Sequence, residues 1–200
     1  MSAGPPTRPS LVGRLRDRND RATWAEFVGL YAPVVFGFAR KAGLQDADAA
    51  DLTQEVLRSV VGAITRFDYT PARGGFRAWL FQITRNHVHS FRRGTARAAR
   101  LTARVPGAAP VPLEEVPAHE DALEAAWEQE WRRELFARAC GHVRPLVEPA
   151  TWEAFHQTAV LGRAGQQVAA ELGLSVAAVY LAKSRVLARL RQFVQAAEEE

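Results

Sequence analysis

The sequence predicts an all-α protein made of two small helical domains joined by a flexible linker. Three observations support this fold class. Apolar residues recur every three or four positions along much of the 200-residue chain, which is typical of helices that bury one side. No segment shows a convincing strand pattern, and no repeat of solenoid length is found. Small residues, arginines and prolines fill 95–120, which predicts a linker between domains at 21–94 and 121–197.

The N-terminal domain is expected to begin after a disordered tail over residues 1–20, because "MSAGPPTRPS" holds little that could be buried. The segment "TWAE" at 23–26 fits a capping box and predicts a helix running to about Lys41. A second helix is expected over 49–66, with Asp46 or Asp48 as its N-cap. Its apolar stripe consists of Leu52, Val56, Val60 and Ile64.

The third predicted helix carries the segment "RAWLFQITRNHVHSFRR", residues 77–93, which interleaves large apolar side chains with arginines. It follows a loop at 68–75 and runs from about 76 to 93. One side is lined by Phe76, Leu80, Ile83, His87 and Phe91, with Trp79 beside them. The helix could have a basic outer face by chance, lie on a membrane, or pack inward while touching nucleic acid. A membrane is disfavoured because the domain needs these aromatic residues for its core.

The C-terminal domain is predicted from a stripe with a period of four residues, Leu123, Trp127, Trp131 and Leu135. Helices are expected at about 150–161, 165–172 and from 176 almost to the end. The last two fit a helix-turn-helix over 165–191, with Gly173 in the turn and Ser175 as N-cap. Its outward residues are Ala177, Ala178, Tyr180, Leu181, Ser184 and Arg185. A plain helical hairpin has the same spacing, so DNA binding does not follow from it alone.

Charge is distributed unevenly, although the net charge is only +4. No acidic residue occurs between Asp68 and Glu114, a stretch with eight arginines. From Glu114 to Glu134 there are eight acids, and after Glu171 the chain turns basic again. Two basic blocks separated by an acidic one indicate two contacts with a polyanion.

Several classes of function are disfavoured. The single cysteine, Cys140, allows no intrachain disulfide and fits a reducing compartment. No apolar run approaches a membrane span and the N-terminus lacks a signal-peptide core, so we expect a soluble, cytoplasmic protein with no membrane partner. The histidines do not fall at metal-site spacing, and no phosphate loop or nucleophile motif occurs. We therefore expect no metal, no cofactor and no catalysis by this chain.

A polar face is predicted on the second helix, where Asp51, Gln54, Glu55 and Arg58 fall at i, i+3, i+4 and i+7. Such a face is typical of an ordinary solvated surface, and spacing alone favours that interpretation.

Three segments together resemble the extracytoplasmic-function group of bacterial RNA polymerase sigma factors. They are "DLTQEVL", "FRAWLFQITRNHVHSFRR" and "QQVAAELGLSVAAVYLAKSRVLARLR", and the likeness covers roughly 24–93 and 130–194. It implies a domain 2-like and a domain 4-like unit, with core RNA polymerase and promoter DNA as partners and, as is common in the family, an anti-sigma factor. The polar face of Asp51, Gln54 and Glu55, with Arg58 beside it, would then dock on the polymerase clamp.

The resemblance also implies that the first domain binds the melted downstream promoter element. Arg77, Trp79, Arg85 and Asn86 match the family's "FRxWL…RN" pattern, with Trp79 expected in the core. Contacts to phosphate or bases are expected from Arg77, Arg85, Asn86, His89, Ser90 and Arg93. The family often has an acid near Ser90, and this sequence departs from the family pattern there. The loop at 68–75, with Tyr69, would hold an unstacked base.

The second domain would read the upstream element in duplex DNA, through Ser175 and the outward residues of the helix-turn-helix. Arg185 matches a basic position of the family, whereas Tyr180 and Leu181 depart from it and imply a different base preference. Arg163, Lys183 and Arg189 are expected to contact phosphates. Two alternatives stay open: a stand-alone helix-turn-helix regulator, and a sigma-like adaptor without full promoter melting.

Overall fold

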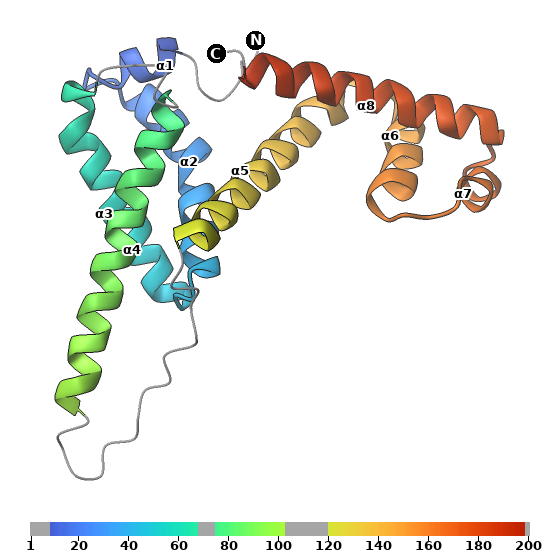
Figure 1. Ribbon diagram of the computed structural model, residues 1–200. Helices are drawn as coiled ribbons and strands as arrows, with labels where there is room; N and C mark the ends of the chain where they lie inside the picture. The colour runs from blue at the N-terminus through green and yellow to red at the C-terminus, as the bar shows by residue number, and fades with distance from the viewer. Residues whose placement is uncertain (1–8, 68–74, 103–119, 199–200) are drawn as a thin grey trace. The chain divides into compact units, whose positions relative to one another are not determined.

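The computed structural model describes residues 9–67, 75–102 and 120–198, and these ranges contain helices and no strand (Figure 1). The predicted all-α class is confirmed. The described chain divides into two compact units, one covering Pro9–Arg132 and the other the residues from Arg133 on. The division falls inside one helix, α5 (Glu120–Val143), whose two halves belong to different units.

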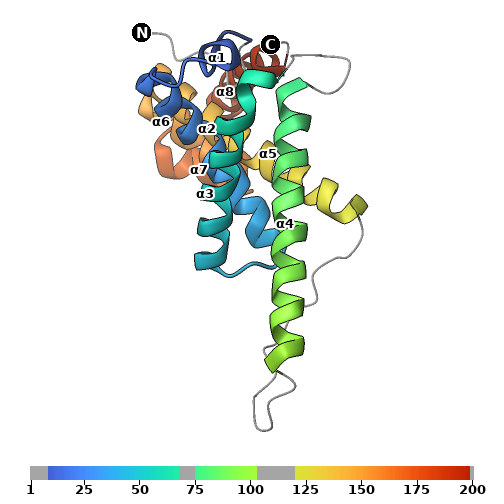
Figure 2. The same ribbon diagram turned by 90° about the vertical axis from the view of Figure 1, so that its left-hand side faces the viewer.

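The N-terminal unit contains four helices and the first half of α5. These are α1 (Pro9–Arg14), α2 (Arg21–Lys41), α3 (Asp46–Ala63), which continues into a 3₁₀ turn at Ile64–Arg66, and α4 (Gly75–Thr102). Helix α3 packs against both α2 and α4, and the three lie side by side (Figure 2). The predicted stripe of α3 is buried, from Leu52 to Ile64.

Helix α1 corrects the expectation of a disordered tail over residues 1–20. Leu11, Val12 and Leu15 are almost fully buried in the core of the N-terminal unit. Their burial provides the hydrophobic free energy that orders a short helix. The composition of "MSAGPPTRPS" describes only the first ten residues, and residues 1–8 lie outside the described part of the chain.

The predicted helix caps were wrong for both α2 and α3. The N-cap of α2 is Asp20, whose carboxylate accepts hydrogen bonds from the Thr23 backbone N–H at 3.0 Å and the Thr23 hydroxyl at 2.5 Å. These bonds hold the pKa of the Asp20 carboxyl below its usual value. Helix α3 begins after Gln45 without a side-chain cap, and Asp46 pairs with Arg40 at 2.6 Å instead.

The core of the N-terminal unit is rich in aromatic rings. Phe27 and Tyr31 of α2 contact Phe76 of α4 edge-on, at centroid distances of 5.8 and 5.3 Å. Trp79, expected in the core, is half-buried and packs on Phe76 and Phe67 at the edge of the core. Edge-to-face pairs add about 0.5–1.5 kcal/mol each beyond the apolar area they bury.

The first half of α5 completes this core. Leu123, Trp127 and Trp131 are buried against it, and Trp127 packs edge-on against Phe38 of α2 at 5.5 Å. The predicted stripe is therefore buried. The C-terminal domain was expected to start at residue 121, but this half of α5 packs with the N-terminal unit. Two tryptophans bury too much apolar surface to remain outside the nearest core, and that core belongs to α2 and α4.

Helix α2 is also long and apolar enough to cross a membrane by length and composition. This corrects the expectation that no apolar run of the sequence approaches the length of a membrane span. Its buried residues, among them Phe27, Tyr31 and Phe38, face the core of the N-terminal unit. The apolar character of α2 is therefore used in packing within the unit.

The C-terminal unit contains the second half of α5, a 3₁₀ turn at Arg144–Leu146, α6 (Pro149–Phe155) with a π turn at His156–Val160, α7 (Gly165–Leu172) and α8 (Val176–Glu198). Both α6 and α7 pack against α8 (Figure 1). One cluster joins α5, α6 and α8 around Val143, Phe155 and Val186. Cys140 lies half-buried at its edge, and burial raises the pKa of its thiol.

Replacing Trp127 by Ala tests whether α5 belongs to the N-terminal core. Trp127 is 2% exposed, so we expect the free energy of unfolding to fall by about 3–5 kcal/mol. The measurement is urea denaturation of the full chain followed by near-ultraviolet circular dichroism. Phe136→Ala is the control, because Phe136 lies on the same helix and is 45% exposed. Equal losses for both variants would contradict the assigned packing.

Candidate functional site

The polar face predicted on α3 is present and open to solvent. Asp51, Gln54, Glu55 and Arg58 are all exposed. The Arg58 guanidinium donates to the Glu55 carboxylate and, at 3.3 Å, to the Gln54 side-chain oxygen. Exposed ion pairs of this kind contribute little stability. These side chains therefore remain available to a partner.

Three of the six residues predicted on α4 face the first half of α5. Arg85 pairs with Glu120 at 2.6 Å and His89 lies 3.2 Å from the same carboxylate. Arg77 pairs with Glu128, and its guanidinium lies 4.7 Å from the centre of the Trp131 ring. These side chains are only about one-quarter to one-third exposed.

The other three predicted residues of α4 are open to solvent. Asn86, Ser90 and Arg93 are exposed, and Arg93 donates a hydrogen bond to the Ser90 hydroxyl at 3.0 Å. The opposite side of the helix is buried through Phe76, Leu80 and Val88. The predicted site is thus one surface with a paired half and an open half. The loop at 68–74, including Tyr69, lies outside the described residues.

The acidic partners on α5 were missed by the sequence analysis. The acidic run at 114–134 is evident in the sequence, but the pairing of Glu120 and Glu128 with α4 and of Glu130 with Lys41 is not. Alternating basic and acidic blocks were the available signal. The two pairs with α4 join residues 35 and 51 positions apart, which no local pattern reveals.

The helix-turn-helix geometry is present at α7 and α8. Gly173 has φ +65° and ends α7 in the left-handed conformation. The Ser175 hydroxyl accepts a hydrogen bond from the Ala178 N–H at 3.1 Å, as expected of an N-cap. The inward side of α8 is buried, as expected from the choice of outward residues. It consists of Val179, Ala182, Val186 and Leu190.

The outward face of α8 combines apolar and basic side chains. Tyr180 and Leu181 are both 56% exposed, and Ala177, Ser184 and Arg185 are also exposed, whereas Ala178 is half-buried. A methyl group at Gly165 would meet the Tyr180 ring at 3.1 Å, so the ring lies over the start of α7. This contact gives Tyr180 a defined position on the face.

The three predicted phosphate contacts differ in their surroundings. Arg163 is held by Glu171 at 2.7 Å, and this hydrogen-bonded pair raises the pKa of Arg163 and lowers that of the Glu171 carboxyl. Arg189 donates to the Leu146 carbonyl. Lys183 is half-buried. Two of the three cations are therefore already engaged within the C-terminal unit.

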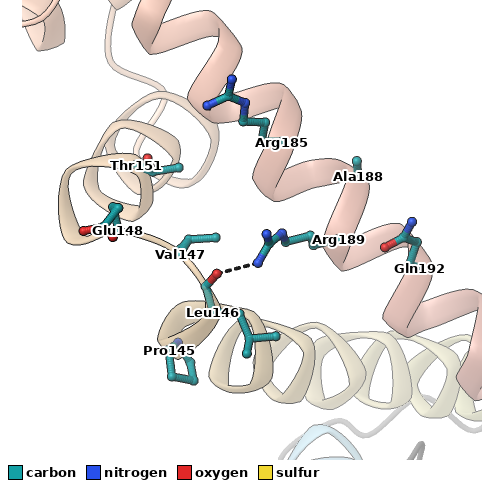
Figure 3. Close-up of a pocket in the computed structure, with 9 residues that line it drawn as sticks. All are labelled: Pro145, Leu146, Val147, Glu148, Thr151, Arg185, Ala188, Arg189 and Gln192. Atoms are coloured by element: carbon teal, nitrogen blue, oxygen red, sulfur yellow. Dashed lines mark hydrogen bonds between the residues drawn. The ribbon is translucent and has the colours of Figure 1, made fainter.

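A groove of about 620 Å³ lies beside the outward face of α8 in the C-terminal unit (Figure 3). Its walls are the segment 145–148 with Thr151 on one side, and Arg185, Ala188, Arg189 and Gln192 on the other. Arg189 crosses toward Leu146, whereas Arg185 lies nearer the N-terminal end of α8 (Figure 3). Within the described ranges no cluster of three His, Cys, Asp or Glu side chains could hold a metal ion.

Comparison with known proteins finds matches to part of the chain. Residues 27–98 match the family described as Sigma-70 region 2. Over 77 residues the chain is 35% identical to the protein named ECF RNA polymerase sigma factor RpoE of Cereibacter sphaeroides. The N-terminal part of the chain is therefore similar to sigma-70 region 2 and to an ECF sigma factor. The match covers 38% of this chain and 41% of that relative.

A solved structure is also similar to this chain. It is described as the structure of CnrH in complex with the cytosolic domain of CnrY. The similarity covers 94% of the chain and 96% of the solved one, at 21% identity and a TM-score of 0.36.

Replacing Gly173 by Ala tests the turn of the helix-turn-helix. A side chain in the left-handed conformation costs about 1–2 kcal/mol, so we expect the C-terminal unit to lose about that much stability, measured by thermal denaturation of the full chain. Gly141→Ala is the control, because Gly141 lies within α5 with open space around it. Alanine there favours the helix by roughly 0.5–1 kcal/mol. A stabilising effect at Gly173 would contradict the assigned turn.

Proposed function

We propose that this chain binds core RNA polymerase and directs transcription initiation from specific promoters. The observation that carries the proposal is the Sigma-70 region 2 match over residues 27–98. That segment includes the exposed face of Asp51, Gln54, Glu55 and Arg58 on α3. The proposed role of this face is docking on the polymerase, since oriented charges on a rigid helix favour a complementary partner surface.

The proposal assigns a different DNA contact to each unit. In the N-terminal unit, α4 would bind the melted downstream element through the six predicted residues. In the C-terminal unit, α8 would enter the major groove of the upstream element with Tyr180, Leu181 and Arg185 toward the bases. Ser175 would act by capping the helix, since its hydroxyl is already bonded to the Ala178 N–H.

Location and further partners follow from the same proposal. A protein that works on polymerase and promoter DNA would act in the bacterial cytoplasm. Bond-making would be done by the polymerase, with no cofactor on this chain. An anti-sigma partner stays a prediction from the family resemblance.

The stand-alone regulator is the main rival, and the family match argues against it. A regulator would keep the helix-turn-helix at 165–191 but would not need the region 2 match or the exposed α3 face. A sigma-like adaptor would have both of these features and would differ only in lacking full promoter melting. Reconstituted transcription separates the three. The purified chain and core polymerase are incubated with fragmented genomic DNA, and transcript starts are mapped. Discrete starts that require the chain support the proposal.

Two other outcomes identify the rivals. DNA binding without a polymerase complex or starts would indicate a regulator. A stable polymerase complex without starts would indicate an adaptor.

Glu55→Lys tests the α3 face within that assay. The substitution reverses a charge at the centre of the face and places a second cation beside Arg58. We expect polymerase affinity to fall by at least about tenfold, while upstream duplex binding stays unchanged. Glu26→Lys is the control, because it makes the same charge change at an exposed position of α2. Unchanged affinity in Glu55→Lys would remove α3 from the proposed interface.

Arg185→Ala tests the upstream contact of α8. Loss of one phosphate or base contact should weaken binding to the upstream element by roughly 1–3 kcal/mol and, for a phosphate contact, lower the salt slope by about one. Duplex binding by fluorescence anisotropy at several salt concentrations measures both. Arg66→Ala removes the same charge from an exposed position of the N-terminal unit. Equal effects of the two substitutions would point to net charge rather than to a contact.

A further inference from the structure

We propose that the first half of α5, Glu120–Arg132, competes within the molecule with single-stranded DNA for the basic face of α4. The idea rests on the proposed function, because it concerns the same α4 residues. In the free chain the carboxylates of α5 occupy part of the site that the DNA phosphates would use. DNA binding then requires these ion pairs to exchange and α5 to be loosened from α4.

The ion pairs fall on the predicted DNA contacts. Glu120 pairs with Arg85 at 2.6 Å and lies 3.2 Å from His89, and Glu128 pairs with Arg77. A carboxylate presents two oxygens to a guanidinium much as a phosphate does, so the same arginine can bind either group but not both in one geometry. The paired half of the face is therefore occupied, whereas Asn86, Ser90 and Arg93 remain exposed.

The carboxylates are held in place by apolar packing on the rest of the unit. Leu123, Trp127 and Trp131 anchor this half of α5 in the aromatic core. Glu130, only 3% exposed, pairs with Lys41 of α2 at 2.8 Å. Its carboxylate lies directly against Gly37, where a methyl group would overlap it. The helix is thus fixed on α2 and presents Glu120 and Glu128 to α4.

The pairs that cover α4 are suited to exchange. Their side chains are partly exposed, and exposed pairs contribute little stability and weaken with salt. Arg85 donates to Glu120 through Nη1, while its Nε is buried with no hydrogen-bond partner among the described residues. A ligand that satisfied more of this guanidinium would have an advantage over Glu120.

Removing the two carboxylates is the direct test. In the full-length double variant Glu120→Gln, Glu128→Gln, the affinity for a fluorescein-labelled single-stranded DNA of mixed sequence should rise about 3- to 10-fold, as expected for loss of two exposed pairs. Fluorescence anisotropy measures it. Asp121→Asn with Glu124→Gln is the matched control, because it removes two acids from the same helix for which the described residues show no ion pair. Equal gains in both double variants would indicate general electrostatics and overturn the proposal.

Gly37→Ala tests the anchoring without changing any charge. The added methyl group displaces the Glu130 carboxylate, so α5 should loosen and DNA affinity should rise. Gly29→Ala is the control, because Gly29 lies on the same helix with open space around it. A gain in Gly37→Ala alone supports the proposal, and equal behaviour of the two glycine variants contradicts it.

Hydrogen exchange gives a readout of the competition itself. Adding the oligonucleotide to the wild-type chain should speed amide exchange in 120–132. The competition would be overturned if DNA bound while amide exchange in 120–132 stayed unchanged and the Glu120→Gln, Glu128→Gln variant showed unchanged DNA affinity. The proposed function would still stand. No DNA binding by any variant would overturn the competition together with the assigned α4 contact. Polymerase binding and its loss in Glu55→Lys would still report on the proposed function separately.

Discussion

The packing of aromatic rings among α2, α4 and the first half of α5 is the interaction on which the N-terminal unit depends. Phe76 is held between Phe27 and Tyr31, and Trp127 contacts rings on both α2 and α4. Because one side of α4 is committed to this core, its arginines must project from the other sides. The mixture of aromatic and basic residues in 77–93 is thus explained by two surfaces of one helix.

In the C-terminal unit, too, one side of a helix is buried and another side is exposed, but different interactions fix the position of the helix. A left-handed glycine and a serine cap fix where α8 begins, and four buried residues fix which side of it faces inward. The exposed side then carries Tyr180, Leu181 and Arg185. In both units, backbone geometry and apolar packing set the position of a face, and the exposed residues are left to set its chemistry.

Periodicity predicted most of the helices and most of the buried residues, because burial repeats with the helix itself. It failed where the outcome depends on choices between near-equivalent groups: Asp20 rather than Thr23 caps α2, and no acid caps α3. Periodicity also predicted that Trp127 would be buried, but it did not predict whether Trp127 would pack in the N-terminal or the C-terminal unit. That choice depends on partners such as Phe38 and Phe81, which are far apart in sequence.

Cys140 has a practical consequence for work on this molecule. It is the only cysteine in the sequence, it is half-buried in α5, and burial raises the pKa of its thiol. Since the thiolate is the nucleophile, this side chain reacts slowly with maleimides and oxidants near neutral pH. A cysteine introduced on an exposed turn of α4 or α8 would be labelled in preference to it, so dyes and photo-crosslinkers can be attached without first removing the native residue.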